Sequence, residues 1–347
     1  TLPQHQRMAL YLCYYQGYTA REAAEIMGKN PSTVRTWLAQ VKRRVDEVTY
    51  QGYESLANSH ILPYFDASGL KLQQVTRQLL QDYMDEKAAH GRKDGKGGLS
   101  PRSLRLHKNI LYQALTEAVK AGLLSANPCE YIDLPSVPRH EAHFYTAEQV
   151  QTLLDSIRDD PLFPLVKITA IYGLRRSELL GLQWDSIDFE SGTLTIRHTV
   201  SKVTKPVEKD KTKNASSYRS FPLLPEARAI FLQALSDQRT NRRLFGKAYQ
   251  ENPYVFKWPD GRPFPPDYIT HHFARLLQKN GLPRIRFHEL RHSCASILLS
   301  NGFTLKDVQE WLGHSDIKMT ANVYGHLDMA RKQSIAQEMS SLLSGKC

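Results

Sequence analysis

Apolar positions recur at helical spacing through much of the first 134 residues. A period near 3.6 residues runs through "TYQGYESLANSHILPYF", "QQVTRQLLQDYMDEKAAH" and "PRSLRLHKNILYQALTEAVKAGLL". The polar, glycine-rich "GRKDGKGGLSP" separates the last two stretches. This pattern predicts a helical domain over residues 46–134. The proline-containing stretch that follows has little periodicity and is typical of a linker, over residues 135–145.

The pattern changes character after residue 146. Helical spacing covers 147–157 and 162–182, and then "GTLTIRHTV" alternates apolar and polar positions as a strand does. A charged loop leads into a second predicted strand, "RSFPLL", and the chain beyond Pro225 is again largely helical in pattern. We therefore expect a multi-domain chain that is mainly α, with a small β-sheet (α+β) in a last domain over residues 146–347.

The first 45 residues predict a helix-turn-helix. Thr19 and Glu22 have the spacing of a capping box, Gly28 marks a turn, and Ser32 or Thr33 begins the last helix. This segment resembles the promoter-reading region of bacterial sigma factors. The basic side chains of its last helix are candidates for DNA contact: Arg35, Lys42, Arg43 and Arg44. An ordinary helical hairpin is the alternative.

Charge narrows the choice of partners. The 347 residues include 46 Lys and Arg against 35 Asp and Glu, a formal charge of +11 that favours a polyanion such as nucleic acid. No apolar run approaches the roughly 18 residues needed to cross a bilayer, and no signal peptide opens the sequence. The four cysteines have neither disulfide-framework nor zinc-site spacing. These features favour a protein of the reducing cytoplasm, without membrane contact.

Several short motifs of the last domain stand in a characteristic order. "GLRRSEL" is followed by "KTKNASSYRSFPL", then "HELRH", then "LGH" and a tyrosine ten residues after its histidine. This order resembles the tyrosine recombinase family, in particular its phage and conjugative-transposon integrase branch. The resemblance covers residues 48–347 and implies a helical, SAM-like core-binding domain before the catalytic domain. It implies six catalytic residues: Arg175, Lys211, His288, Arg291, His314 and Tyr324.

The residue types suit DNA cleavage without metal. Breaking a phosphodiester requires a nucleophile, positive charge beside the phosphate oxygens and a proton for the leaving oxygen. The sequence offers no Asp or Glu cluster with metal-ligand spacing, so we expect no metal or other cofactor, and the forks of Arg175 and Arg291 supply the charge. Arg176 should point to another face.

One helix start is predicted as an anion cradle. His288 and Arg291 share a face, the helix end offers N–H groups to an anion, and the apolar run 297–299 anchors the other end in the core. The resemblance makes His288 the acid or base near the nucleophile. His292 is better interpreted as a packed histidine.

The remaining roles come from the resemblance. Tyr324 is the nucleophile, and its attack leaves a 3'-phosphotyrosyl link that can be religated without ATP. Lys211 protonates the leaving 5'-oxygen, although Lys209 and Lys213 lie in the same loop. His314 binds a phosphate oxygen, and Glu178 orients Arg175 or a neighbouring histidine.

The family also implies partners. Double-stranded DNA is bound in a C-shaped clamp, and strand exchange needs a homo-oligomer, a tetramer in the synapse. The tail, with apolar spacing at Ile335 and Met339, suits helix exchange with a neighbouring subunit or packing on its own domain. An excisionase or a DNA-bending protein is a further expected partner. The resemblance also implies a bacterial, nucleoid-associated location in the cytoplasm.

Two other functions fit parts of the sequence. A non-enzymatic helix-turn-helix regulator explains the charge and residues 1–45 but not the catalytic order, and a type IB topoisomerase shares the tyrosine chemistry. The amino-terminal unit departs from the strand-rich arm-binding domain of many integrases. It is either an accessory DNA reader or a fusion unrelated to recombination.

Overall fold

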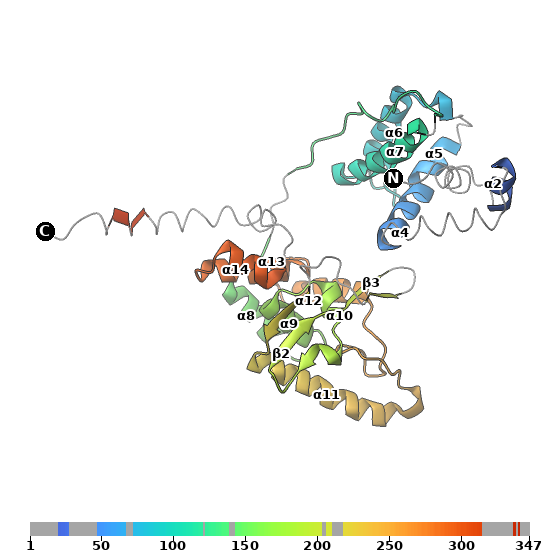
Figure 1. Ribbon diagram of the computed structural model, residues 1–347. Coiled ribbons are helices and arrows are strands. Elements are labelled where there is room, and N and C mark those ends of the chain that lie inside the picture. The colour runs from blue at the N-terminus through green and yellow to red at the C-terminus, as the bar shows by residue number, and fades with distance from the viewer. Residues whose placement is uncertain are drawn as a thin grey trace. The chain divides into compact units, whose positions relative to one another are not determined.

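The computed structural model of the protein divides into two compact units, Thr1–Arg139 and His140–Cys347 (Figure 1). The structure describes residues 20–27, 47–66, 72–120, 122–138, 143–202, 206–209, 218–313, 336–337 and 339–340. The division lies inside the segment predicted as a linker. The predicted domain limits themselves stay a prediction.

The described part of the first unit is helical. Its elements are α2 (Ala20–Ile26), α4 (Glu47–Leu56), the π-helix η2 (Ala57–Ile61), α5 (Leu62–Asp66), the 3₁₀ turn η3 (Leu72–Gln74), α6 (Arg77–His90) and α7 (Pro101–Lys120). Thr76 caps α6 by accepting a hydrogen bond from the Leu79 N–H at 3.2 Å. The three helical stretches expected from periodicity are thus present.

The core of this unit contains a buried polar pair. The Tyr83 hydroxyl lies 2.8 Å from His107 Nδ1, and both residues are at most 1% exposed. Leu80, Met84 and Leu104 surround them in the same cluster. This hydrogen bond pairs two buried polar groups and so stabilises the contact between α6 and α7.

The second unit is mixed α and β (Figure 1). Its helices are α8 (Ala147–Ser156), α9 (Phe163–Tyr172), α10 (Arg176–Leu180), η4 (Trp184–Ser186), α11 (Pro225–Phe245), η6 (Gly246–Ala248), α12 (Pro266–Lys279), α13 (Glu289–Ser300) and α14 (Leu305–Leu312). Its strands are β1 (Ile187–Asp188), β2 (Thr193–Ile196), β3 (Thr199–Lys202), β4 (Pro206–Lys209) and β5 (Arg219–Pro222). The predicted fold class is confirmed.

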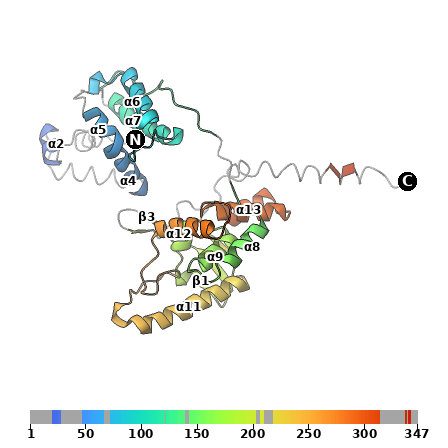
Figure 2. The same cartoon turned by 180° about the vertical axis from the view of Figure 1, so that it is seen from behind.

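The sheet is small and antiparallel. Its order is β1-β2-β5, with Leu194 opposite Phe221 and Ile196 opposite Arg219, while β3 and β4 form a separate hairpin. Helix α13 packs against α9 and α14. Helix α11 lies at the edge of the unit away from α13, as both views show (Figure 2). The start of β5, at Arg219, meets the end of α14 through a hydrogen bond to the Trp311 carbonyl, and Arg291 joins the ends of α9 and α14.

Two predicted elements are wrong in extent. The helix expected over 162–182 is two helices, because Gly173 takes the left-handed conformation with φ 61° and ends α9. Periodicity hides this break, since Leu174 and Leu179 on its far side are buried too. The strand expected across "GTLTIRHTV" is also two strands, β2 and β3, which pair with different partners.

The cysteines and the carboxy-terminal tail lie only partly within the described residues. Cys129 and Cys294 are buried free thiols, and Cys13 and Cys347 lie outside the described residues. Most of the tail proposed to exchange between subunits also lies outside them, although Met339 is 50% exposed. None of the described helices has the length and apolar character needed to cross a membrane.

Candidate active site

Arg175 is presented by a sharp reversal of the chain. Gly173 closes α9 with its N–H bonded to the Thr169 carbonyl at 2.8 Å, and Arg175 is the extended residue that precedes α10. A Cβ at position 173 would lie 2.2 Å from Leu312 Cδ2, in addition to the strain of the positive φ. Only glycine therefore allows α9 to end against α14 and release Arg175 at the start of α10.

Glu178 lies directly beneath Arg175. Its Oε1 accepts a hydrogen bond from Arg175 Nη1 at 2.5 Å, and its Oε2 accepts one from the Arg175 backbone N–H at 2.9 Å. The Glu178 side chain is 1% exposed, whereas that of Arg175 is 29% exposed. The carboxylate thus fixes both the backbone and the fork of Arg175. Arg176 leaves this site, as predicted from its position, and donates to the Pro266 carbonyl at 3.1 Å.

Arg219 completes the group and was missed in the sequence analysis. From β5 it donates to Glu178 Oε2 at 3.0 Å through Nη2 and to Oε1 at 3.3 Å through Nη1. A signal for it exists in "RSF": residues two apart on a strand share a face, so Arg219 lies on the face of the buried Phe221. A charge on the buried face of a strand needs a partner.

Arg291 is the most deeply buried arginine of the site. It extends from α13 with 1% of its surface exposed, and its Nη1 donates to the Gly173 carbonyl at 2.6 Å. Its Nη2 donates to the Leu312 carbonyl at 2.5 Å. Arg291 thereby joins the end of α9 to the end of α14.

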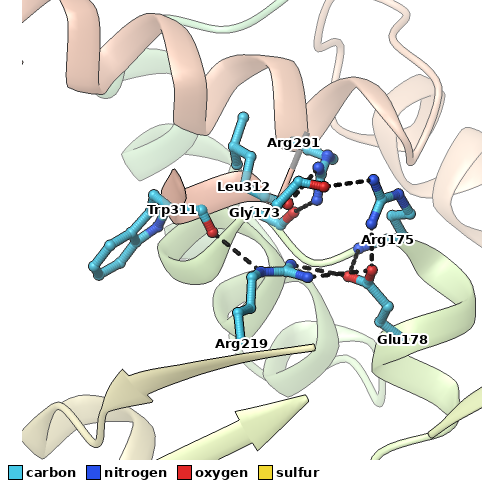
Figure 3. Close-up of polar contacts among 8 residues, drawn as sticks. Gly173, Arg175, Glu178, Arg219, Arg291, Trp311 and Leu312 are labelled. Atoms are coloured by element: carbon cyan, nitrogen blue, oxygen red, sulfur yellow. Dashed lines mark hydrogen bonds and ion pairs between the residues drawn. The ribbon is translucent and has the colours of Figure 1, made fainter. Parts of the chain in front are cut away.

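The carbonyls at the end of α14 accept hydrogen bonds from all three arginines of the site, Arg175, Arg219 and Arg291 (Figure 3). Trp311 O accepts from Arg219 Nε at 3.1 Å, Leu312 O from Arg291, and Gly313 O from Arg175 Nη2 at 3.1 Å. Carbonyls at a helix end lack partners within the helix and carry its partial negative charge, which cations stabilise. The end of α14 therefore sets the spacing of the guanidinium groups. We call Arg175, Glu178, Arg219 and Arg291 the arginine cluster.

The arginine cluster carries excess positive charge. Three guanidinium groups face one carboxylate. Burial alone would raise the pKa of Glu178, but the charges and hydrogen bonds of Arg219, followed by the charge of Arg175, lower it to about 2. Burial, followed by the Arg175 charge, lowers the pKa of Arg291, although a guanidinium stays protonated at neutral pH. This excess positive charge, next to the partly exposed guanidinium group of Arg175, favours binding of an anion.

The predicted N–H cradle at the start of α13 is not present. The N–H groups of Glu289, Leu290 and Arg291 already donate to the carbonyls of Arg286, Phe287 and His288. None of these three N–H groups is therefore free to bind an anion. The acidic Glu289 of the same turn instead forms an ion pair with Arg286, with Oε1 and Nη2 2.7 Å apart. Anion binding here rests on side chains.

The burial of α13 is also the reverse of the prediction. Leu290, Arg291, Ser293 and Cys294 are buried in the first half, whereas residues 297–299 are only partly buried. The helix is anchored at its polar end because α9 and α14 cover that end. The apolar run instead packs along the edge of the core.

His288 precedes α13 at the surface. The residue is exposed, and its ring meets that of His292 edge-on with centroids 5.5 Å apart. Partial loss of hydration, followed by the charges of His292 and Arg291, lowers the pKa of His288 to about 4. The ring is therefore neutral at pH 7 and able to accept a proton. His292 is half-buried against it.

Three predicted catalytic residues, Lys211, His314 and Tyr324, lie outside the described residues. The same holds for the predicted DNA contacts Arg35, Lys42, Arg43 and Arg44. His314 follows Gly313 directly, so its segment begins at the arginine cluster. No three His, Cys, Asp or Glu side chains gather as metal ligands among the described residues. The expectation that no metal is needed stays a prediction.

Comparison with known families accounts for most of the chain. Residues 143–331 match the phage integrase family, and residues 32–88 match the SAM-like N-terminal domain of phage integrases. Residues 1–45 match region 4 of sigma-70 factors. The last two matches overlap, so the predicted boundary at 45/46 stays a prediction.

Similar proteins include recombinases and integrases. A XerC-like tyrosine recombinase of Caldanaerobacter subterraneus subsp. tengcongensis is 28% identical, over 89% of this chain and 82% of that protein. The ICEBs1 integrase of Bacillus subtilis is 24% identical, over 90% and 83%.

Solved structures share the fold. The Tn1549 transposon integrase in complex with a circular intermediate DNA has a TM-score of 0.69 at 22% identity, covering 86% of this chain and 97% of that one. A lambda integrase dimer bound to a core site has a TM-score of 0.59 at 16% identity, covering 83% and 76%. With the family match spanning more than half of the chain, the resemblance seen in the motifs is confirmed: the protein belongs to the phage integrase family of tyrosine recombinases.

Proposed function

We propose that this tyrosine recombinase cuts and rejoins DNA at specific sites through a 3'-phosphotyrosyl intermediate on Tyr324, for integration and excision of a mobile element. The observation that carries the proposal is the arginine cluster. Its surplus charge lies next to the residue, Gly313, from which the chain continues to His314 and Tyr324. Preorganised charge of this kind stabilises a phosphorane better than mobile water does.

The arginines have different accessibility. Arg175 exposes 29% of its side chain and is suited to touch a non-bridging phosphate oxygen directly. Arg291 exposes 1% and is covered by the Gly173 and Leu312 carbonyls to which it donates. Direct contact between Arg291 and phosphate requires these covering residues to move. Without that movement, Arg291 contributes charge from beneath Arg175.

The proton transfers follow from the chemistry. The Tyr324 oxygen attacks phosphorus, the bond from phosphorus to the 5'-oxygen breaks, and Lys211 supplies the proton that the leaving oxygen needs. A neutral His288 accepts the proton of the tyrosine hydroxyl, and His314 donates to a phosphate oxygen. In the reverse step a 5'-hydroxyl attacks the phosphotyrosine, so the bond energy is kept and no ATP is consumed.

The relatives support the substrate and the setting. The Tn1549 and lambda integrases were solved with DNA, and the ICEBs1 protein is named an integrase. We extend double-stranded DNA binding to this chain, with four subunits in the synapse joined through their tails, and an excisionase or DNA-bending protein as helper. The sigma-like segment adds a second DNA contact through Arg35 and Lys42 to Arg44.

The other functions explain less. A helix-turn-helix regulator has no use for three guanidinium groups arranged around one buried carboxylate, because such an arrangement costs desolvation that simple DNA binding does not need. A type IB topoisomerase needs neither a specific site nor several subunits. Site specificity and multimeric synapsis distinguish it from a recombinase.

The test traps the intermediate. The full chain is incubated in EDTA with a nicked suicide fragment from the ends of the element that carries its gene, and covalent adducts are separated on a denaturing gel. The wild type should form an adduct and Tyr324→Phe should not. Tyr218→Phe is the matched control, since Tyr218 is 59% exposed in the same unit and should be dispensable. Specific binding without an adduct from the wild type would refute the proposal.

A further inference from the structure

We propose that Arg219 is a positioning residue of the recombination reaction, which fixes Glu178, and through it Arg175, against the end of α14. The inference rests on the proposed function. It assigns a task to a residue outside the predicted catalytic set.

Arg219 is held from two sides by its own contacts. Its guanidinium lies 5.3 Å from the Phe221 ring centroid, and Phe221 in turn meets the Trp311 ring edge-on at 4.9 Å. The Nε donates to the Trp311 carbonyl at 3.1 Å. The side chain is 8% exposed. Arg219 is thus packed between β5 and α14 and is too buried to touch DNA itself.

Glu178 transmits the position of Arg219 to Arg175. Each carboxylate oxygen is shared: Oε1 accepts from Nη1 of Arg175 at 2.5 Å and Nη1 of Arg219 at 3.3 Å. Oε2 accepts from the Arg175 backbone at 2.9 Å and from Arg219 Nη2 at 3.0 Å (Figure 3). A shift of Arg219 therefore displaces both acceptors on which the Arg175 fork rests.

The end of α14 joins the same network. Arg219 and Arg175 donate to carbonyls two residues apart, those of Trp311 and Gly313. The position of the helix end is therefore coupled to the positions of both arginines. Because the chain continues from Gly313 to His314 and Tyr324, Arg219 connects the charge that meets the phosphate to the start of the segment with the nucleophile.

An arginine suits this position because the task needs several bonds at once. Three separate nitrogens of Arg219 reach Glu178 and Trp311. A lysine keeps the charge but has one nitrogen on a flexible stem, so it cannot hold the carboxylate and the carbonyl in a fixed relation. Charge and geometry can therefore be separated experimentally.

The test measures adduct formation at saturating suicide DNA, alongside the dissociation constant of the same DNA. Arg219→Gln should slow adduct formation by about 10- to 100-fold, the range for residues that orient a catalytic group. DNA affinity should change by less than about threefold, because Arg219 is too buried to touch DNA and its loss affects the transition state rather than the bound ground state. Arg219→Lys should preserve the unfolding temperature better than Arg219→Gln while still slowing cleavage.

Arg228→Gln controls, at an exposed position, for the loss of an arginine that contacts an aromatic ring and a backbone carbonyl. Arg228 also lies over an aromatic ring, with its guanidinium 5.4 Å from the centroid of Phe189, and donates to a backbone carbonyl at 2.7 Å, but has no bond to Glu178. Its replacement should leave the rate unchanged. If the control slows cleavage as much as Arg219→Gln does, loss of any arginine–ring contact in this unit explains the effect and the inference is wrong.

A double-mutant cycle separates positioning from general damage. Arg175→Lys keeps a charge but cannot hold both Glu178 and Gly313. In that background Arg219→Gln should slow cleavage by less than about twofold, because coupled residues are not additive. Full additivity, or a wild-type rate for Arg219→Gln alone, would overturn the inference. Absence of an adduct from the wild type instead removes the proposed function, so the two failures are distinguishable.

Discussion

Replacing Glu178 by glutamine tests the electrostatics of the arginine cluster. The substitution conserves shape but removes the only carboxylate that faces the three guanidinium groups in this cluster. One end of the amide can still accept a hydrogen bond, while its NH₂ group would meet an arginine donor, whichever way it is turned. The variant should therefore be less stable than the wild type.

The magnitude follows from the burial and the pKa. The Glu178 side chain is 1% exposed, and its pKa is lowered from 4.5 to about 2. At about 1.4 kcal/mol per pKa unit, this preference for the charged form is on the order of 3 kcal/mol. Removing one partner of a buried ion pair costs about 3–5 kcal/mol. For a unit of this size, the unfolding temperature should fall by roughly 6–12 °C or more.

The assay is unfolding of the full chain by heat and, separately, by urea, each monitored by tryptophan fluorescence. Three of the four tryptophans, Trp184, Trp258 and Trp311, lie in the second unit, so the signal reports chiefly on it. Glu310→Gln is the control, because Glu310 is 70% exposed and pairs with Lys306 at 3.8 Å on the surface of α14. Such a pair contributes less than about 0.5 kcal/mol. Equal losses in the two variants would refute the reasoning.

Three further predictions concern backbone, pH and metal. Gly173→Ala should lower the free energy of unfolding, measured by urea titration, by about 2–4 kcal/mol, because of the positive φ and the contact of the added Cβ with Leu312. Gly192→Ala has φ 66° and no atom within 4 Å of the added Cβ, so it should cost only about 1 kcal/mol. Equal costs in the two variants would contradict the packing argument. Folding lowers the pKa of Glu178, so the stabilisation from its carboxylate is complete above about pH 4.5 and is lost as the pH falls towards about 2. The free energies of unfolding of the wild type and Glu178→Gln should therefore converge across that range. A constant difference between them would contradict the pKa shift. Adduct formation should proceed equally in EDTA and in magnesium, and dependence on the metal would contradict arginine-based catalysis.

The sequence predicted local elements well where the signal is local. Helix α8 begins at Ala147 after Thr146, whose side chain and Gln149 form a capping box, and α6 follows a capping threonine in the same way. Strand β2 likewise lies in the stretch whose alternation predicts a strand, and β5 lies in the second predicted strand. These features depend on neighbours a few residues away.

The wrong predictions concern features that depend on contacts outside the local sequence pattern. Gly173 ends α9 because it meets Leu312, far along the chain, and an isolated glycine in an apolar helical pattern gives no sign of that contact. The N–H groups at the start of α13 were assigned to an anion, although the preceding turn uses them.

Arg219 was overlooked for a related reason. The motifs identify Arg175 and Arg291 through their order, but the pairing of Arg219 with Glu178 joins residues 41 positions apart. Its position on the buried face of β5 was a usable signal, because a buried charge implies a partner even when the partner cannot be named. The charge balance of the site thus became clear only from the fold.

The most direct test of the central claim is to map the covalent bond. The adduct formed on suicide DNA is digested with protease and nuclease, and the peptide that retains a nucleotide is sequenced by mass spectrometry. The account predicts a single modified residue, Tyr324, joined to the 3'-phosphate of the cleaved strand. A nucleotide on any other residue, or a 5'-phosphate linkage, would contradict it.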